Sequence, residues 1–87
     1  MARIVARYQV TSYAEWRRMV DECLPALRQR GISNVEVFHA AHGPSDVLLI
    51  FEGASVERLR ATWDSGELRH WRHEGGALAE VLYVPDP

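Results

Sequence analysis

The sequence predicts an α+β domain in which four strands and two helices follow one another in the order βαββαβ. Three observations lead to this prediction. Apolar and polar residues alternate in residues 2–10, apolar residues recur every three or four positions after Ser12, and an unbroken apolar run extends from Val47 to Phe51. The first pattern is typical of a half-buried strand, the second of an amphipathic helix, and the third of a strand covered on both faces.

The length of 87 residues predicts a single domain spanning residues 1–87. A domain of this size buries only about 60–65% of the surface of its unfolded chain, so its own core supplies little stability. The single cysteine, Cys23, excludes an intramolecular disulfide and favours a reducing compartment. We therefore expect a partner subunit to contribute to stability.

Charge and hydropathy exclude several classes of partner. Ten basic residues, all of them arginine, stand against twelve acidic residues, and no basic stripe is present, so we expect no nucleic-acid partner. No stretch approaches the roughly 20 apolar residues of a membrane span, and no signal peptide is visible. The expected protein is cytoplasmic and does not bind membranes.

The first strand, residues 2–10, is followed by a helix. The strand places Ile4, Ala6, Tyr8 and Val10 on one face. Ser12 with Glu15 has the form of a capping box, and Gly31 is the expected C-terminal cap. Between them lies the stripe that we expect to face the core: Tyr13, Trp16, Met19, Val20, Cys23, Leu24 and Leu27.

The second half repeats the same unit. Residues 32–41 and 46–52 are expected strands, joined by a turn at residues 42–45. Ser55 is the expected cap of the second helix, which directs Val56, Leu59 and Trp63 inward. A short helical piece with Leu68 and Trp71 inward follows Gly66 and ends at Gly75-Gly76. Residues 80–84 form the expected last strand.

This order is the ferredoxin-like arrangement, in which the first and third strands are central and both helices cover one face. Leu48 and Ile50 then point to the face opposite Val47, Leu49 and Phe51. At about 25 cal/mol per Å², leaving an apolar sheet face in water costs several kcal/mol, comparable to the stability of a small domain. We therefore expect two copies to pair sheet to sheet as a homodimer.

The chain resembles the dimeric α+β-barrel superfamily, including antibiotic-biosynthesis-monooxygenase-like and small cyclase-like proteins. The resemblance covers nearly the whole chain. It depends on the first strand leading into residues 12–16, on Gly31, on the turn at residues 43–46 and on residues 65–69. These motifs are caps and turns, so they identify a fold better than an activity. The resemblance implies two sheets packed into a barrel, with a ligand pocket in each subunit between sheet and helices.

The sequence departs from the superfamily in two places. The segment between Arg69 and Glu80 is shorter than the resemblance leads us to expect, which changes the rim of the pocket. Cofactor-free monooxygenases of the superfamily tend to use an Asn–Trp pair, whereas the one asparagine here, Asn34, lies at the start of a strand. Oxygen chemistry therefore has less support than the fold.

Four histidines fall in two pairs, His39 with His42 and His70 with His73. Side chains at i and i+3 share a helix face, so the second pair has a spacing that a metal would accept. No third ligand lies at a suitable spacing, and we expect no metal. Surface histidines are the preferred interpretation, with His70 or His73 as the alternative general acid or base.

Tyr8 is a candidate catalytic residue because Ala6 beside it leaves room on a central strand and its phenol can donate a proton. A core tyrosine is the equal alternative. Arg7 points to the opposite face, where pairing with Glu36 or Glu52 is the preferred interpretation. Glu80 can serve as a pocket acid, although solvation at the sheet edge is the preferred reading.

The candidate substrate-binding residues sit at positions where core packing is the ordinary role of an aromatic side chain. In this fold the core and the pocket wall are continuous, so both roles can hold. The candidates are Trp16, Trp63, Trp71 and His39.

The first functional hypothesis is a cofactor-independent cyclase or isomerase of secondary metabolism, acting on a largely apolar small molecule. It would hold a reactive conformer and supply acid/base help from Tyr8 and a histidine. The second is a cofactor-free monooxygenase in which the electron-rich ring of the substrate activates oxygen. The third is a binding domain without chemistry. None of the three requires a cofactor.

Overall fold

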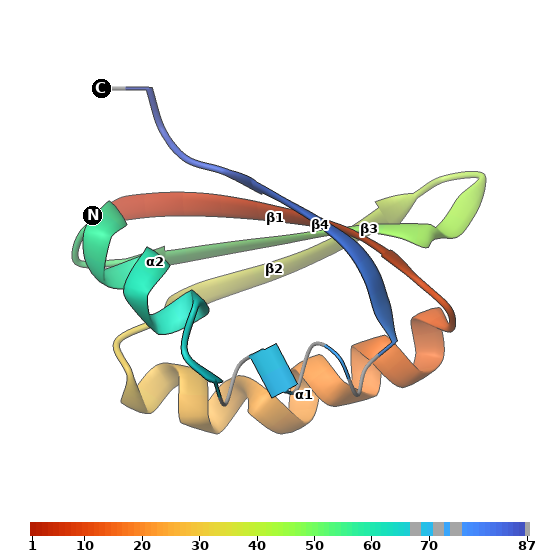
Figure 1. Ribbon diagram of the computed structural model, residues 1–87, viewed down its shortest axis with the longest axis horizontal. Helices are drawn as coiled ribbons and strands as arrows, with labels where there is room; N and C mark the ends of the chain where they lie inside the picture. Colours follow the sequence, from red (N-terminus) through yellow and green to blue (C-terminus); the bar gives the residue numbers. More distant parts are fainter. Residues whose placement is uncertain (67–68, 71–72, 74–75, 87) are drawn as a thin grey trace.

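The computed structural model describes residues 1–66, 69–70, 73 and 76–86. The elements follow the predicted order: β1 (Ala2–Val10), α1 (Tyr13–Gln29), β2 (Ser33–Ala40), β3 (Gly43–Gly53), α2 (Val56–Trp63) and β4 (Ala77–Tyr83). The strands form one antiparallel sheet in the order β2-β3-β1-β4, with β1 and β3 central as expected (Figure 1). The ferredoxin-like fold is therefore confirmed.

The largest differences from the expected element boundaries lie at the starts of β3 and β4, and the other strand ends differ by one residue at most. β3 begins at Gly43, because Gly43 pairs with Ala40 and the turn is limited to residues 41–42. β4 begins at Ala77, which pairs with Val10 across a bulge that shifts the β1–β4 register. Residues 66, 69, 70 and 73 have helical backbone, in agreement with the expected helical piece, while Leu68 and Trp71 lie outside the described residues.

Both helices begin at the predicted caps. The Ser12 hydroxyl accepts a hydrogen bond from the Glu15 backbone N–H at 3.3 Å, and the Ser55 hydroxyl accepts one from Arg58 N–H at 3.1 Å. Such caps satisfy N–H groups that have no partner inside the helix. After α1 the chain passes through Gly31, whose φ of 86° is the left-handed conformation that glycine adopts readily. No helix among the described residues is long and apolar enough to cross a membrane.

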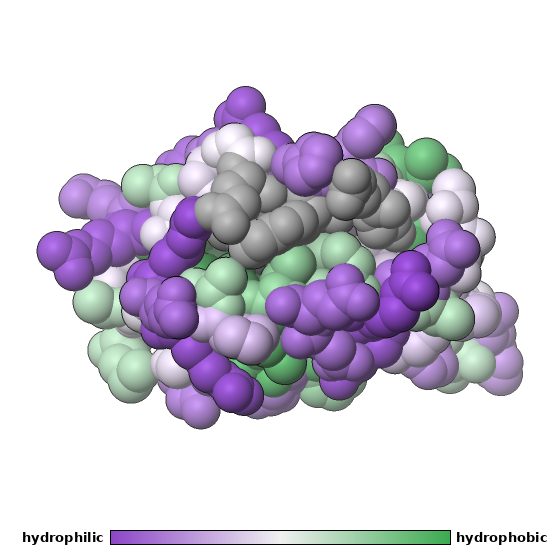
Figure 2. Space-filling model, turned by 90° about the horizontal axis from the view of Figure 1, so that it is seen from below, coloured by the Kyte–Doolittle hydropathy of each residue, from purple (hydrophilic) through white to green (hydrophobic). Residues whose placement is uncertain are grey.

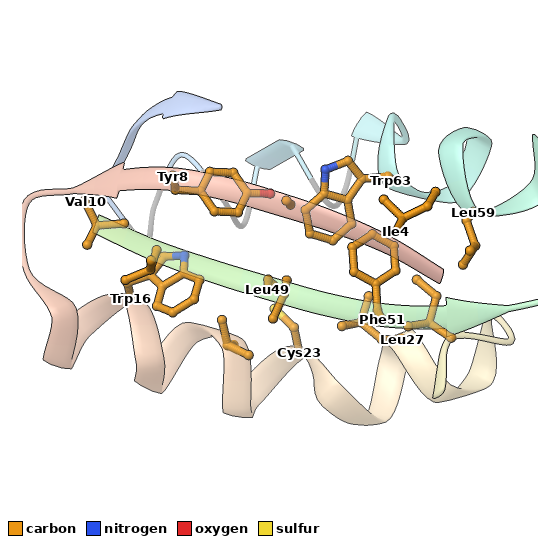
Figure 3. Packing of buried hydrophobic residues seen from close by; sticks show 14 residues of the cluster. Ile4, Tyr8, Val10, Trp16, Cys23, Leu27, Leu49, Phe51, Leu59 and Trp63 are labelled. Carbon is orange, nitrogen blue, oxygen red and sulfur yellow. The ribbon is translucent and has the colours of Figure 1, made fainter. Parts of the chain in front are cut away.

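One face of the sheet forms the core with both helices. Alternation along β1 and β3 directs every second side chain toward the helices, so the core receives side chains from both central strands. Figure 3 shows this layer between the sheet and α1. Its buried members are Ile4, Ala6, Tyr8, Val10, Trp16, Val20, Cys23, Leu27, Ile32, Val47, Leu49, Phe51, Leu59 and Trp63.

Figure 2 views the helix side of the molecule, on which hydrophilic residues are interspersed with apolar ones. The residues of α1 that are buried are Trp16, Val20, Cys23 and Leu27, whereas its charged residues Arg18, Asp21 and Glu22 are exposed. The predicted orientation of this helix is confirmed.

The opposite face of the sheet, which we call the open face, carries no helix of the described residues. Phe38, Val81 and Tyr83 are each 49% exposed on it. Val5, Leu48 and Ile50 lie between them and are only partly buried. The chain therefore leaves an apolar surface on the face where the sequence predicts one.

The predicted partners of Arg7 are wrong. Arg7 forms a bidentate pair with Asp46, from Nε to Oδ1 at 3.0 Å and from Nη2 to Oδ2 at 2.8 Å. Glu36 and Glu52 instead contact Arg3, at 3.7 Å and 3.4 Å. The register explains the difference, because Arg3 lies directly opposite Glu52 and Arg7 lies four residues farther along β1.

Candidate functional site

Tyr8 lies at the centre of the core, on the helix-facing side of β1, as the alternation predicts. Its side chain is 1% exposed. The ring centroid lies 6.2 Å from that of Trp16 and 6.3 Å from that of Trp63, and the hydroxyl points along the core toward Trp63 (Figure 3). Tyr8 is thus part of an aromatic cluster that reaches from the start of α1 to the end of α2.

Trp63, the last residue of α2, connects this cluster to the edge of the sheet. Its ring stacks on Phe51 with centroids 4.6 Å apart and an interplanar angle of 23°. Its indole Nε1–H donates a hydrogen bond of 2.7 Å to Oε1 of Glu80. The buried indole therefore donates a hydrogen bond to the carboxylate of an exposed residue on the edge strand β4.

Glu80 is the functional candidate that the sequence underestimated. It stands directly opposite Tyr8 in the β1–β4 register, so the two side chains lie on the same face of adjacent strands. Glu80 is exposed, in agreement with the predicted solvation at the sheet edge, and its carboxylate also accepts a hydrogen bond from the buried Trp63. One sequence signal points to Glu80: it is the single acid in an otherwise apolar strand. In the ferredoxin-like fold this strand pairs with β1, which carries Tyr8.

A groove of about 230 Å³ opens beside Glu80, which we call the Glu80 groove. Its lining residues are Arg69, His73 and four residues of β4, namely Ala77, Leu78, Ala79 and Glu80. The backbone fixes this corner: Gly76 N–H donates to the His73 carbonyl, and Thr11 N–H donates to the Gly76 carbonyl, each at 3.1 Å. Three of the lining residues, Arg69, His73 and Glu80, are titratable.

The other predicted site residues are placed as follows. Trp16 is 1% exposed and belongs to the aromatic cluster. His70 is exposed on the segment that carries His73, and Trp71 lies outside the described residues. His39 lies on β2, the edge strand at the opposite side of the sheet from β4, where its ring packs edge-on against Tyr13 at 5.0 Å. The structure therefore places Tyr8, Trp16 and Trp63 in one aromatic cluster and His73 in the lining of the Glu80 groove. His39 lies at the opposite edge of the sheet.

Asn34 and the histidine pairs bear on two further expectations. The Asn34 amide, at the start of β2, donates to Glu52 Oε2 at 2.9 Å. Within the described ranges of the chain, no three His, Cys, Asp or Glu side chains come together as a metal site. The expected lack of a metal stays a prediction.

The open face has a hollow of its own. A groove of about 470 Å³ is lined by apolar side chains around the Arg7–Asp46 pair, and its lining residues are Val5, Arg7, Phe38, His39, Ala40, Asp46, Leu48 and Tyr83. The hydrogen bond and charge of Arg7 lower the pKa of the Asp46 carboxyl, and Asp46 in turn raises the pKa of Arg7. The pair therefore stays ionised near neutral pH.

No protein-family model matches the sequence, and no curated relative was found. Solved structures do match. A protein of Bordetella bronchiseptica described as an antibiotic biosynthesis monooxygenase has a TM-score of 0.79 at 18% identity, over 99% of this chain and 95% of the other. A Deinococcus radiodurans protein with the same description has a TM-score of 0.76 at 11% identity, over 100% and 92%. SnoaB of Streptomyces nogalater, described as a cofactor-independent oxygenase, has a TM-score of 0.75 at 10% identity, over 99% and 93%.

These likenesses show the fold. The chain has the ferredoxin-like α+β fold of antibiotic biosynthesis monooxygenase proteins, the resemblance that the sequence suggested. Identities of 10–18% among these three structures carry no residue roles. The activity of this chain has to be argued from its own side chains.

Proposed function

We propose that this chain is a cofactor-independent enzyme that moves a proton on a largely apolar small molecule, as a cyclase or isomerase does, with Glu80 as general acid/base. The observation that carries the proposal is the 2.7 Å hydrogen bond from Trp63 Nε1 to Glu80 Oε1. A general base must be held within reach of the proton that it removes, and such catalysis contributes roughly 10²–10⁴-fold.

The surroundings of Glu80 support this role. The stacking of Trp63 on Phe51 orients the donor that holds the carboxylate, so Glu80 is placed before a substrate arrives. In the proposed reaction Glu80 takes a proton from an acidic C–H or O–H and returns it at another atom of the same molecule. Atoms and electrons balance without an oxidant. His73 in the groove and Tyr8 behind Trp63 are the further proton donors that we propose.

A second candidate is monooxygenation, which the descriptions of the similar structures favour. Proton removal by Glu80 would make the substrate electron-rich, and molecular oxygen would be the co-reactant. Converting a CH₂ group to C=O with O₂ places one oxygen atom in the product and the other in water, so no external reductant is needed. Both candidates therefore begin with the same proton transfer.

We further propose that the enzyme is a homodimer in which the open faces of two copies pack together. Phe38, Val81 and Tyr83, each 49% exposed, supply the apolar surface. The charges on this face are arranged in pairs, Arg3 with Glu36 and Glu52 and Arg7 with Asp46, so two identical faces do not repel strongly. Apolar burial with balanced charge suits a self-complementary interface.

The test uses 2-tetralone, a bicyclic ketone with an acidic CH₂ group. Exchange of its C1 protons in D₂O, followed by NMR, should be accelerated by the wild-type protein and slowed about 100-fold by Glu80→Gln, because the amide cannot accept the proton. Glu57→Gln removes an exposed acid from α2 and is the matched control. No acceleration by the wild type, or an equal rate in Glu80→Gln, contradicts the proposal.

Two further measurements divide the candidates. Oxygen consumption that depends on 2-tetralone and disappears in Glu80→Gln supports monooxygenation, whereas exchange without oxygen uptake supports the isomerase. Tyr8→Phe should keep the fold and lower the exchange rate, since it removes a proton donor and leaves the ring in place. An unchanged exchange rate in Tyr8→Phe would show that Tyr8 serves only in packing.

A further inference from the structure

We propose that aromatic side chains of the core form a relay that carries an oxidising equivalent from the β4 side of the sheet to the surface beside β2. The residues that lose and regain an electron are Trp63, Trp16 and Tyr13. The relay would remove a one-electron oxidant, such as an aryloxyl or peroxyl radical, that forms beside β4. The inference goes beyond the proposed proton transfer and does not depend on it.

The rings of the relay follow one another through the core. The ring centroid of Tyr8 lies 6.3 Å from that of Trp63 and 6.2 Å from that of Trp16 (Figure 3). Trp16 in turn lies 6.1 Å from Tyr13. Electron transfer slows steeply with distance, so neighbouring rings allow a charge to cross the core in short steps. Indoles and phenols are also the aromatic side chains that give up an electron most readily.

The Trp63 end of the relay is arranged for oxidation. Its indole is 3% exposed, and its Nε1–H donates a hydrogen bond of 2.7 Å to Glu80 Oε1. An indole that loses an electron becomes a cation with a strongly acidic N–H, and a cation in a buried position is costly. Transfer of this proton to Glu80 leaves a neutral indolyl radical and a neutral carboxyl group. The hydrogen bond therefore makes Trp63 easier to oxidise.

The Tyr13 end of the relay reaches solvent. Tyr13 is the first residue of α1 and is only partly buried. Its ring packs edge-on against the exposed His39 of β2, with centroids 5.0 Å apart. A phenol that loses an electron also loses its hydroxyl proton, and water can accept that proton here. A radical on Tyr13 is therefore accessible to a dissolved reductant such as a thiol.

The transfer balances in electrons and protons. The oxidant takes one electron from Trp63, whose N–H proton passes to Glu80. An electron then moves from Tyr13 to Trp63 by way of Trp16, which is transiently a cation, and crosses the Tyr8 ring, which keeps its hydroxyl proton. The proton on Glu80 returns to Trp63 Nε1, and Tyr13 releases its hydroxyl proton to water. The net products are the reduced oxidant, a phenoxyl radical on Tyr13 and one proton.

The experiment supplies the oxidant at one end of the relay and detects the radical at the other. Leu78→Cys introduces a thiol on β4 at a position that is 70% exposed, whereas the natural Cys23 is buried, so a thiol-reactive ruthenium polypyridyl complex labels the introduced thiol. A laser flash with a cobalt(III) ammine as electron acceptor converts the label to ruthenium(III), a one-electron oxidant. Trp71→Phe in every sample leaves Trp16 and Trp63 as the two indoles of the chain.

We expect a phenoxyl radical after the flash, detected by transient absorption and electron paramagnetic resonance. Tyr13→Phe should lose this signal and leave an indolyl radical in its place. Trp63→Phe should lose the phenoxyl signal, because a phenylalanine ring does not give up an electron to this oxidant. Tyr83→Phe is the matched control, since it removes an exposed tyrosine outside the relay and should keep the signal.

The role of Glu80 has a spectroscopic test. Trp16→Phe interrupts the relay behind Trp63 and should hold the radical on that indole, with the absorption of the neutral indolyl radical. Adding Glu80→Gln should change the absorption to that of the indole cation radical, because an amide does not accept the proton. A structural role of Glu80 would not change the protonation state of the radical.

Absence of a phenoxyl radical from the labelled parent, or a phenoxyl signal that survives Trp63→Phe or Tyr13→Phe, overturns the relay. Should Trp63→Phe fail to fold, Trp16→Phe is the second interruption and should also lose the phenoxyl signal.

The relay and the proposed function fail separately. If no phenoxyl radical forms while Glu80→Gln still slows exchange of 2-tetralone, the relay is wrong and the proton-transfer function stands. If the phenoxyl radical depends on Trp63 while exchange is indifferent to Glu80, the relay stands without the proposed chemistry.

Discussion

The two faces of the sheet are built from the same strands, and they differ in whether they carry charged side chains. On the helix-covered face, the described side chains that are buried are all apolar or aromatic, and none is charged. On the open face, apolar residues such as Phe38 and Tyr83 alternate with arginines and acids that are paired with one another. The first face can be buried within one chain, and the second is suited to burial only against a matching surface.

This difference assigns separate roles to neighbouring residues of one strand. Leu49 and Phe51 of β3 point into the core, and Leu48 and Ile50 point to the open face. A strand covered on one side only would alternate apolar with polar, as β1 does. The unbroken run in β3 therefore contributes side chains to the core and, in the proposed dimer, to the interface.

The largest expected effects come from placing a carboxylate on each face of β3. Leu49→Asp should prevent folding at any protein concentration, because an unpaired buried charge together with a lost leucine costs more than about 4 kcal/mol. Leu48→Asp should disrupt the proposed dimer and yield a chain whose folded fraction rises with concentration. Circular dichroism and sedimentation over a hundredfold range of concentration measure both.

The controls are Leu49→Ile and Leu48→Ile, which keep the apolar surface and should behave like the wild type. A wild-type protein that sediments as a folded monomer at micromolar concentration contradicts the dimer. A well-folded, stable monomer from Leu48→Asp would show that the open face is not an obligate interface.

A smaller contrast is expected when a phenylalanine is truncated on each face. Phe51 is 1% exposed and stacks on Trp63, so Phe51→Ala should cost about 3–5 kcal/mol at every protein concentration. Phe38 is 49% exposed, and Phe38→Ala should change the stability of the monomer by less than about 1 kcal/mol. Urea titrations at several concentrations separate the two, because an interface residue affects only the concentration-dependent part. If Phe51→Ala and Phe38→Ala lowered the free energy of unfolding equally at all protein concentrations, the two faces would not differ in the proposed way.

The order of elements and the facing of β1 could be predicted from the sequence because both depend on local periodicity. Alternation placed Tyr8 inside and Arg7 outside, and the two caps fixed where the helices begin. The partners of Arg7 could not be predicted in the same way. They depend on the β1–β3 register, in which a shift of a few residues exchanges Arg7 for Arg3 opposite the acids of β2 and β3.

The candidate site was predicted only in part for the same reason. Tyr8, Trp63 and His73 were recognised as aromatic or titratable residues at suitable positions, but nothing local connects Trp63 with Glu80, which lies 17 residues away. The start of β4 was placed three residues late, at residue 80 instead of Ala77, because a bulge interrupts its alternation. Contacts between an edge strand and a helix end are set by tertiary packing, which single-sequence patterns do not contain.

The smallest effect concerns the ion pair at the centre of the open face. Arg7 lowers the pKa of Asp46 below its ordinary value of 3.8, so the folded state favours the carboxylate. A depressed pKa contributes stability that is fully present above the unfolded value and is lost as pH falls through the folded one. Stability should therefore be insensitive to Asp46 between pH 5 and 7 and should decline below about pH 4.

Asp46→Asn tests this contribution. The variant should show a shallower loss of stability between pH 4 and pH 2 than the wild type, and the difference should shrink in 1 M salt, where exposed charges are screened. Because the pair is solvent-accessible in a single chain, the effect on the monomer should be slight.

In the proposed dimer the same pair loses water, so removing one partner leaves Arg7 unpaired at the interface and should weaken association near neutral pH. Urea midpoints and dimer dissociation constants at pH 7 and pH 3 measure the two effects. Asp46→Asn that leaves dimer affinity unchanged at pH 7 would place the Arg7–Asp46 pair outside the interface.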